Sequence, residues 1–384
     1  MRIVYVIDSL ASKGGAERII TDKMNYLAEE FGFEVTVVTC YQNFAIQPNA
    51  YTLSGKVTQV NLNIPYYSQY HVRYPRRLWV KWALYRKLCR DLSLKVSLID
   101  PDVLLGVGYF NADMVCRIPG KAIKIIESHE ARTFTMSDKG LKRSLFSRLF
   151  MKFFRAQYFR RIERHADVVV TLTEGDAKEW NRAKRVEVIP DFSVLEVVQQ
   201  SSCTQKRVLA VGRLEWQKGF DSLLDAWTIV SGRHPDWRLD IFGSGTLERE
   251  LQEQIRIYGL QNVRITPFSS RIGEEYAHSS IFALSSRFEG FSLVILEAMR
   301  YGVPCVTFDC PYGPGEVVED GICGFVVENG NVPLLAEKIC MLIEHDDLRH
   351  NFSVAALERA KVFDVDTIME QWRSLFYELA ESAI

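Results

Sequence analysis

Two glutamates eight positions apart, Glu289 and Glu297, lie in the stretch 287–299. Glu289 falls in the turn after a strand-like run at 280–286, and Glu297 falls inside the apolar helix that follows. A carboxylate in such a helix is costly to bury unless it is paired or hydrogen-bonded. Glu297 therefore lies either on a solvated seam of the helix or beside a ligand rich in hydroxyl groups.

Two cations, Arg213 and Lys218, follow another strand-like run at 207–211. Lys218 stands where the next helix, 220–230, is expected to begin, and a cation there opposes the helix dipole. An unfavourable placement of this kind near a strand end indicates a functional residue, because proteins accept local conflicts mainly at functional sites. A bound diphosphate would reverse the penalty, with arginine supplying a planar fork and lysine a point charge. The spacing favours this anion site over a pair of surface cations.

The glycine patterns give weaker signals. Gly14 and Gly15 open a helix, where their backbone could approach an anion or could simply form a tight turn. Two other runs, 106–108 and 243–245, begin a dinucleotide fingerprint, but Asn111 and Glu248 occupy the third glycine position. Nicotinamide and flavin binding are therefore disfavoured.

Metal and disulfide sites are not expected. The acidic run 364–366 reads as the start of a helix, because it follows no core strand. The eight cysteines form no Cys-x-x-Cys pair, which indicates reduced thiols and not a zinc site or a disulfide framework. No run of 18 apolar residues is present, and the first ten residues read as a strand and not as a signal peptide.

Short β-rich runs alternate with helical segments along the whole chain. The strands expected first are 3–7, 34–40, 102–107, 123–126 and 167–172, and a second series is 207–211, 237–242, 263–266, 281–285 and 303–308. A chain of 384 residues is long for one core. The pattern predicts two doubly wound, Rossmann-like α/β domains facing a central cleft, with the linker in the polar stretch 199–206. The predicted divisions are 1–195, 206–365 and a C-terminal helix, 366–384.

His129 lies just past the strand at 123–126, at the edge where open α/β sheets bind ligands. A purely structural histidine is the alternative. The chain is also divided in charge: residues 1–195 hold 30 Lys and Arg against 20 Asp and Glu, which leaves 17 against 28 in the rest. A basic half and an acidic half are expected to have different partners.

The stretch 139–164 has nine Lys or Arg, one acid and six aromatic residues. A surface that binds anionic lipid head groups is favoured over a basic helix packed on the sheet. Nucleic acid is not expected, because no recognition motif accompanies the charge.

Together these motifs resemble glycosyltransferase family 4, whose members are retaining enzymes of the GT-B fold. The resemblance rests on 14–18, on Gly212-Arg213 with Lys218-Gly219, on 288–291 with 297–299, and on 302–306. It covers essentially the whole chain and is strongest from 206 to 330. The segment from 309 to 327 is similar to bacterial polysaccharide-assembly members.

The resemblance implies a role for each candidate residue. Arg213 and Lys218 bind the donor pyrophosphate and stabilise the leaving nucleoside diphosphate, and Glu289 contacts hydroxyls of the transferred sugar. The backbone at Phe291, Ser292 and Leu293 holds phosphate and sugar, and Glu297 binds the ribose. His129 lies close to the donor sugar, Gly15 approaches the diphosphate, and the C-terminal helix packs on the first domain. Cations and amides at the diphosphate can stabilise the transition state without a metal.

The implied activity is transfer of a hexose or N-acetylhexosamine from a nucleotide sugar, with UDP favoured, to a saccharide acceptor in surface polysaccharide assembly. A lipid-linked acceptor and a cytoplasmic, peripheral membrane location fit the basic first half. No cofactor or metal is expected. The alternatives are a phosphorylase or epimerase of the same architecture, and a non-catalytic sugar-nucleotide-binding protein.

Overall fold

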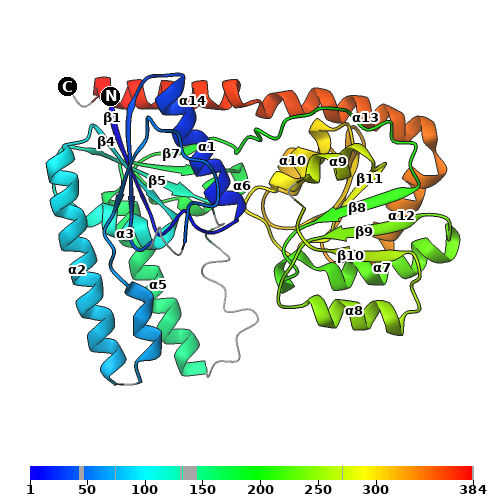
Figure 1. The fold of residues 1–384 in the computed structure, drawn as a ribbon, viewed down its shortest axis with the longest axis horizontal. Coiled ribbons are helices and arrows are strands. Elements are labelled where there is room, and N and C mark those ends of the chain that lie inside the picture. The colour runs from blue at the N-terminus through cyan, green and yellow to red at the C-terminus, as the bar shows by residue number, and fades with distance from the viewer. Residues whose placement is uncertain (43–46, 74, 130–131, 133–144, 270, 383–384) are drawn as a thin grey trace. The chain divides into compact units, whose positions relative to one another are not determined.

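The computed structural model describes residues 1–42, 47–73, 75–129, 132, 145–269 and 271–382, with side chains from 145 to 154 excepted. The chain divides into two compact units (Figure 1). The first unit combines Met1–Ile189 with Ile368–Ile384, and the second is Pro190–Thr367. The chain therefore passes between the units twice.

The first unit contains a parallel sheet of seven strands in the order β3-β2-β1-β4-β5-β6-β7. The strands are β1 (Arg2–Ile7), β2 (Glu34–Thr39), β3 (Thr58–Asn61), β4 (Val103–Val107), β5 (Ile123–Ser128), β6 (Val168–Thr171) and β7 (Val186–Val188). Ile3 lies opposite Val35 on one side and Val103 on the other. The strand order reverses between β1 and β4, and such reversals are where α/β sheets bind ligands.

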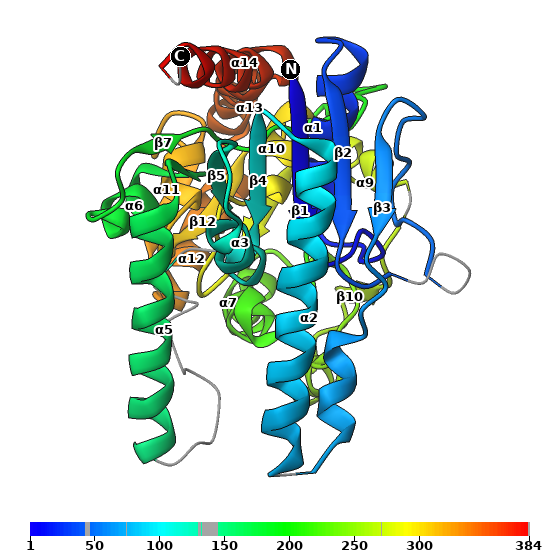
Figure 2. The same ribbon diagram turned by 90° about the vertical axis from the view of Figure 1, so that its left-hand side faces the viewer.

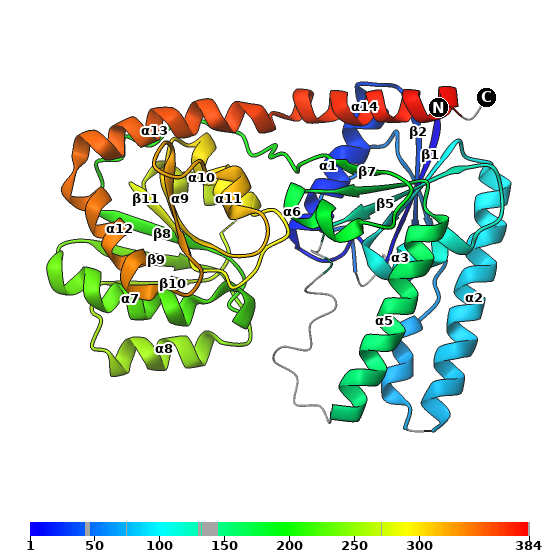
Figure 3. The same ribbon diagram turned by 180° about the vertical axis from the view of Figure 1, so that it is seen from behind.

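Helices cover this sheet because their apolar stripes match its buried faces. They are α1 (Gly15–Glu29), α2 (Arg76–Ile99), α3 (Gly108–Arg117), α5 (Leu145–His165) and α6 (Glu174–Ala177), with 3₁₀ turns η1 (Tyr66–His71) and η2 (Lys178–Trp180). Figures 2 and 3 show that α2 and α5 extend well past the ends of the strands.

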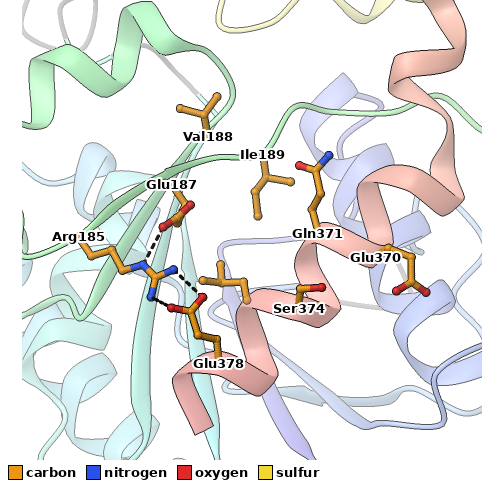
Figure 4. Close-up of a pocket in the computed structure, with 9 residues that line it drawn as sticks. Arg185, Glu187, Val188, Ile189, Glu370, Gln371, Ser374 and Glu378 are labelled. Atoms are coloured by element: carbon orange, nitrogen blue, oxygen red, sulfur yellow. Dashed lines mark hydrogen bonds and ion pairs between the residues drawn. The ribbon is translucent and has the colours of Figure 1, made fainter. Parts of the chain in front are cut away.

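The last helix, α14 (Val365–Ser382), packs in the first unit from Ile368 onward. Trp372 and Phe376 are buried, and the Phe376 ring lies 6.4 Å from that of Phe33. At the rim of a shallow pocket, Arg185 forms two hydrogen bonds with Glu378 at 2.7 and 2.9 Å (Figure 4). The helix is thus fixed by an apolar stripe with a bidentate ion pair beside it.

The second unit contains a parallel sheet of six strands in the order β10-β9-β8-β11-β12-β13. The strands are β8 (Arg207–Val211), β9 (Arg238–Phe242), β10 (Val263–Thr266), β11 (Ile281–Leu284), β12 (Cys305–Asp309) and β13 (Gly324–Glu328). Its helices are α7 (Phe220–Arg233), α8 (Glu248–Ile257), α9 (Ile272–Ala277), α10 (Leu293–Arg300), α11 (Pro314–Val317), α12 (Val332–Glu344) and α13 (Asp346–Ala360), with 3₁₀ turns η3 (Trp216–Lys218) and η4 (Lys361–Phe363). Here the strand order reverses between β8 and β11.

The predicted α/β class with two parallel sheets is confirmed, and the interior strands lie where the sequence places them. The sequence analysis missed β3, β7 and β13, all of which form sheet edges. Strands β3 and β7 are half exposed or exposed along their length, so they lack the continuous apolar run that marks an interior parallel strand, whereas β13 is largely buried and was missed despite its apolar residues. The first unit ends at Ile189, ahead of the polar stretch 199–206.

The basic stretch 139–164 falls partly outside the described residues. In its described part, Phe159 and Ile162 are buried against the sheet side of α5, and Arg161 pairs with Asp113 at 2.7 Å. This part of α5 therefore packs as an ordinary covering helix. No helix among the described segments is both long enough and apolar enough to cross a bilayer.

Candidate functional site

An ion pair joins the two loops singled out in the second half of the sequence. Lys218 Nζ lies 2.7 Å from Glu289 Oε1, and both side chains are largely buried, at 13% and 7% exposed. The Ser286 hydroxyl donates a second hydrogen bond to the same oxygen at 2.5 Å. Glu289 therefore neutralises the cation that stands before α7.

The strand order places this pair. Lys218 follows β8 and Glu289 follows β11, and these neighbouring strands form the point where the sheet order reverses. Carboxyl ends of parallel strands meet at one edge of the sheet, and ligands bind there. The loop after β8 and the loop after β11 are thus brought together by topology.

Backbone and side-chain bonds hold the two loops in register. The Gln217 side chain donates to the Phe288 carbonyl at 3.1 Å, and the Arg287 amide donates to the Gln217 carbonyl at 2.8 Å. The Arg287 guanidinium pairs with Asp221 in the first turn of α7 at 2.6 Å. These partners carry no motif of their own in the sequence, so sequence analysis missed Gln217 and Arg287.

Gly219 is needed where the 3₁₀ turn η3 joins α7. Its φ is +62°, and a Cβ there would lie 2.1 Å from the Ser285 carbonyl oxygen. Only glycine adopts this conformation readily and permits so close an approach. The same glycine lets the backbone turn directly after Lys218.

Arg213 lies in the same loop but is more open. Its guanidinium donates to the Gln217 side chain at 3.1 Å, in an exposed position. Among the described residues, no hydrogen bond or ion pair joins Arg213 to Lys218 or Glu289, so it lies in the same loop as Lys218 without bonding to the ion pair.

The start of α10 has an unusual backbone. Ser292, the residue before the helix, has φ +68° and is 5% exposed, and its hydroxyl has no hydrogen-bond partner among the described residues. Phe291 is buried beside it, and Leu293 begins the helix. The first amides of a helix lack intrahelical partners and attract anions.

Glu297 is buried and not on a solvated seam. The residue is 8% exposed, and its Oε2 accepts a hydrogen bond from the Tyr276 hydroxyl at 2.9 Å. Tyr276 in turn stacks on Tyr301, with 5.6 Å between ring centroids. The sequence analysis missed Tyr276. The signal that could have indicated it is that a buried Glu297 carboxylate needs a hydrogen-bond donor nearby.

In the first unit, His129 follows β5 and bonds to a buried carboxylate. Its Nε2 lies 3.1 Å from Glu127 Oε2, and Lys23 of α1 bonds to the same oxygen. Burial raises the pKa of Glu127, but Lys23 and His129 together bring it below its ordinary value. The Lys23 ammonium also lies 3.9 Å from the centroid of the Trp372 ring. An acid inside an otherwise apolar strand was the sequence signal for this network.

Gly15 begins α1 at the carboxyl end of β1. The neighbouring Gly14 is extended, and a Cβ there would lie 2.2 Å from Glu17 Oε2. A carboxylate therefore already lies over this helix N-terminus, so an anion could bind only if Glu17 moved. Gly15 and His129 belong to the first unit and the other candidate residues to the second.

The described residues offer no ready metal site: no three His, Cys, Asp or Glu side chains among them could share an ion. All eight cysteines are free thiols, and seven are buried. The chemistry that this arrangement can perform is therefore recognition of an anion and of hydroxyl groups, at the β8 and β11 ends.

Comparison with known proteins gives a family for the second unit. Residues 195–359 match the family model of glycosyl transferases group 1. The amylovoran biosynthesis glycosyltransferase AmsD of Erwinia amylovora is 38% identical over 223 residues, which cover 55% of this chain and 62% of AmsD. An uncharacterized glycosyltransferase of Haemophilus influenzae is 26% identical over 383 residues, 97% of this chain and 99% of that protein.

A solved structure extends the comparison to both units. The S. aureus TarM G117R mutant, in complex with fondaparinux, α-GlcNAc-glycerol and UDP, superposes with a TM-score of 0.78. The match covers 98% of this chain and 99% of TarM, at 15% sequence identity, and so concerns the fold. The chain therefore has the GT-B fold, and its second unit carries the domain of the group 1 glycosyltransferase superfamily.

Proposed function

We propose that this chain is a family 4 glycosyltransferase that moves a hexose or N-acetylhexosamine from a nucleotide sugar to a saccharide acceptor. The observation that carries the proposal is the buried Lys218–Glu289 pair at the strand-order reversal of the second sheet. It puts a cation for a phosphate beside a carboxylate for sugar hydroxyls. The group 1 match over residues 195–359 supports the same activity.

Each residue has a defined part in this proposal. Lys218 and Arg213 stabilise the negative charge that builds on the departing diphosphate, as preorganised donors do in other active sites. Glu289 uses Oε1 for Lys218 and Ser286, which leaves Oε2 to accept from a hydroxyl of the transferred sugar. The backbone amides at 291–293 hold phosphate and sugar, and the buried Glu297 accepts hydrogen bonds from the ribose.

The first unit contributes Gly15 and His129 to the same reaction. Gly15 offers backbone to the diphosphate, and Glu17 swings away from the helix N-terminus when the donor binds. His129 faces the donor sugar and is oriented by its bond to Glu127. A ring nitrogen fixed by a buried carboxylate keeps one orientation and one tautomer.

The proposed reaction is retaining and needs no metal. The bond from the anomeric carbon to the diphosphate oxygen breaks, and the electron pair leaves with the diphosphate. The acceptor oxygen attacks from the same face, and its proton passes to the departing phosphate oxygen. Uridine is the proposed base, in keeping with the UDP in the TarM complex.

The acceptor that we propose is a lipid-linked saccharide, used in surface polysaccharide assembly at the cytoplasmic face of a membrane. The net charge of +10 over residues 1–195 supports this, since cytoplasmic leaflets are negatively charged. The similarity to AmsD, named for amylovoran biosynthesis, supports the polysaccharide role.

A donor panel tests the proposal. The protein is incubated with UDP-, GDP- and ADP-linked hexoses and N-acetylhexosamines plus a short oligosaccharide acceptor, with and without EDTA. We expect release of a nucleoside diphosphate at a rate that EDTA does not reduce. The product should have the same anomeric configuration as the donor sugar, as shown by the anomeric proton in its NMR spectrum. Release of UMP or free sugar phosphate in place of a nucleoside diphosphate would count against a transferase, and binding without turnover would favour a non-catalytic protein.

A further inference from the structure

The first half of α2 is unusual for a helix in an α/β domain, because none of its described side chains is fully buried. The buried residues of α2 are Leu88, Leu92 and Val96, all in its second half. Every described side chain from 76 to 87 is exposed or half exposed. Figure 2 shows this half of α2, with η1 beside it, extending past the ends of the strands. Leu84 and Tyr85 at the end of this half pack against the core, and the turns before them are exposed or half exposed.

Large apolar and aromatic side chains occupy this exposed segment. Trp79 is 73% exposed, Trp82 53% and Leu78 55%, and the two indole rings lie 6.0 Å apart. From η1, Tyr67 and Tyr70 add rings that are 47% and 60% exposed and stacked at 6.2 Å. Single exposed apolar residues are ordinary, but a contiguous group of this size marks an interaction surface.

The charge of the same segment has one sign. Between Glu34 and Asp91 the chain contains no acidic residue and eight Lys or Arg, six of them in the range 73–87. The Arg77 guanidinium lies 4.3 Å from the Tyr70 ring, and that of Arg86 lies 4.7 Å from the Trp82 ring. The flanking carboxylates are engaged, since Asp8 accepts a hydrogen bond from Tyr67 and Asp91 pairs with Arg90 at 2.9 Å.

We propose that this aromatic–basic end, formed by Tyr67 and Tyr70 of η1 and residues 76–87 of α2, docks on an anionic lipid surface. Tryptophan and tyrosine rings favour the head-group level of a bilayer, where one edge is apolar and the other wet. Lysine and arginine near the surface are attracted by anionic head groups. The segment offers both features at one projecting tip, with no acidic side chain of its own to oppose them.

The shape of the segment argues for a lipid surface over other anionic partners. Proteins that bind single-stranded nucleic acid use a basic groove with aromatic platforms. Here the cations and rings belong to η1 and the first half of α2, which extend past the ends of the strands (Figure 2), and neither the pocket beside Arg185 nor the one beside Lys361 includes them. A protein partner would require complementary acids, whereas nucleic acid is treated below as an outcome of the test.

This inference rests on the proposed function, transfer of sugar to an acceptor at a membrane, and identifies the part of the chain that contacts the membrane. The sequence analysis assigned lipid binding to the stretch 139–164, whose described part belongs to α5. In the described part of α5, Phe159 and Ile162 pack inward. The aromatic–basic end thus replaces that stretch as the principal contact, and the two assignments can be separated by mutation.

Vesicle sedimentation tests the assignment on the full chain. Vesicles of phosphatidylcholine alone and with 30% phosphatidylglycerol are used at low and at physiological salt. The Trp79→Ser/Trp82→Ser variant is expected to bind anionic vesicles at least tenfold more weakly. An Arg76→Gln/Lys81→Gln/Arg86→Gln variant should bind on the order of a hundredfold more weakly and lose its salt dependence. Tryptophan emission of the wild type should shift to the blue on binding.

Matched controls come from the other end of the same helix and from α5. Leu98 is 79% exposed, and a Leu98→Ser/Lys95→Gln variant changes apolar area and charge there without touching the aromatic–basic end. It should bind vesicles as the wild type does. The Arg160→Gln/Arg164→Gln variant removes two positive charges from α5, and its affinity for anionic vesicles should fall less than threefold.

The outcomes separate the surface from the reaction. All variants should retain wild-type UDP affinity and nucleoside diphosphate release with a soluble acceptor. If the wild type fails to bind vesicles, or binds neutral and anionic vesicles equally, the proposed lipid partner is wrong. The proposed transfer reaction is not contradicted by that result, because it is measured separately with a soluble acceptor. Unchanged vesicle binding in both aromatic–basic variants, or loss only in the α5 variant, overturns the location. Stronger binding to a poly-dT oligonucleotide than to vesicles would assign the end to nucleic acid and reject the proposal.

Discussion

The Lys218–Glu289 pair places two opposite charges in a largely buried setting. Burying an ion pair contributes little net stability, but removing one partner leaves the other charge uncompensated. A pair of this kind is well suited to exchange partners, because a diphosphate can take Lys218 and a sugar hydroxyl can take Glu289. The residues are thus held in place before the donor arrives.

Replacing Lys218 tests this exchange. Lys218→Ala is expected to reduce kcat/KM about 100- to 1,000-fold, as does loss of one transition-state donor in other enzymes. It should also destabilise the second unit, because Glu289 remains buried and charged. Lys218→Ala/Glu289→Gln should recover the stability but not the turnover. The exposed Lys206, paired with Asp236, supplies the control Lys206→Ala; turnover near wild type in Lys218→Ala would remove the pyrophosphate assignment.

Glu297 tests the ribose assignment separately. Glu297→Gln keeps the shape and removes the charge, and the UDP affinity measured by calorimetry should fall about tenfold, the typical loss for one charge-assisted hydrogen bond. Tyr276→Phe removes the hydroxyl that orients Glu297 and should weaken UDP binding less. An affinity that is unchanged in both variants would show that Glu297 has only a structural role.

Glu127 makes a prediction about pH. Its folded pKa is below its ordinary value, so the stability it contributes is present above the unfolded pKa of about 4.3 and is lost as pH falls through the folded value. Glu127→Gln should cost about 3–5 kcal/mol at pH 7, because the buried Lys23 ammonium loses the carboxylate that it bonds to. The difference between wild type and variant, measured by urea unfolding from pH 7 to pH 3.5, should shrink as pH falls. A constant difference would contradict the ionised network.

At the scale of the element, the link between η3 and α7 determines where Lys218 stands. Gly219→Ala puts a Cβ against the Ser285 carbonyl at positive φ, so the turn must shift and take Lys218 with it. We expect a loss of about 2–3 kcal/mol in the free energy of unfolding, together with weaker UDP binding. Chemical denaturation and calorimetry check the two effects.

The other end of α7 provides the control. Gly232 has nothing within 4 Å of an added Cβ, so Gly232→Ala should be neutral or stabilise the helix by up to about 1 kcal/mol. If both substitutions are neutral, the turn at Gly219 is adaptable and the close approach is not required. If both destabilise, the effect belongs to α7 as a whole and not to its junction with η3.

At the scale of the whole molecule, α14 makes the first unit depend on the end of the chain. Trp372 is buried, and its ring covers the ammonium of Lys23, which itself bonds to Glu127. Trp372→Ala should cost about 3–5 kcal/mol. Hydrogen exchange should show the loss in β1, β4 and β5 but not in the strands of the second unit, which ends at Thr367.

The partly exposed Tyr377 of the same helix is the matched control. Its side chain is 49% exposed, and Tyr377→Ala should change exchange in neither unit by a comparable amount. Equal loss of protection in both units after Trp372→Ala would mean that they unfold together. That result would contradict the assignment of α14, from Ile368 onward, to the core of the first unit.

The sequence by itself determined the local features of this protein. Interior parallel strands are continuous apolar runs, so β1, β4, β8 and β11 could be located from composition, and the loops after them could be named. Arg213, Lys218, Glu289 and His129 were found because polar residues at strand ends break that pattern. The edge strand β3 was missed because a half-exposed segment lacks the apolar signal, whereas β13 is largely buried and was missed despite it.

Only the tertiary structure decided how those features combine. The pairing of Lys218 with Glu289, 71 positions away, depends on β8 and β11 being neighbours, which strand composition does not specify. The burial of Glu297 against Tyr276 and the exposure of Trp79 and Trp82 were equally out of reach. An amphipathic pattern says which residues prefer an interior, but burial depends on which surfaces the fold brings together. The chemistry of this chain is thus encoded in its loops, and its geometry is set by the order of the strands.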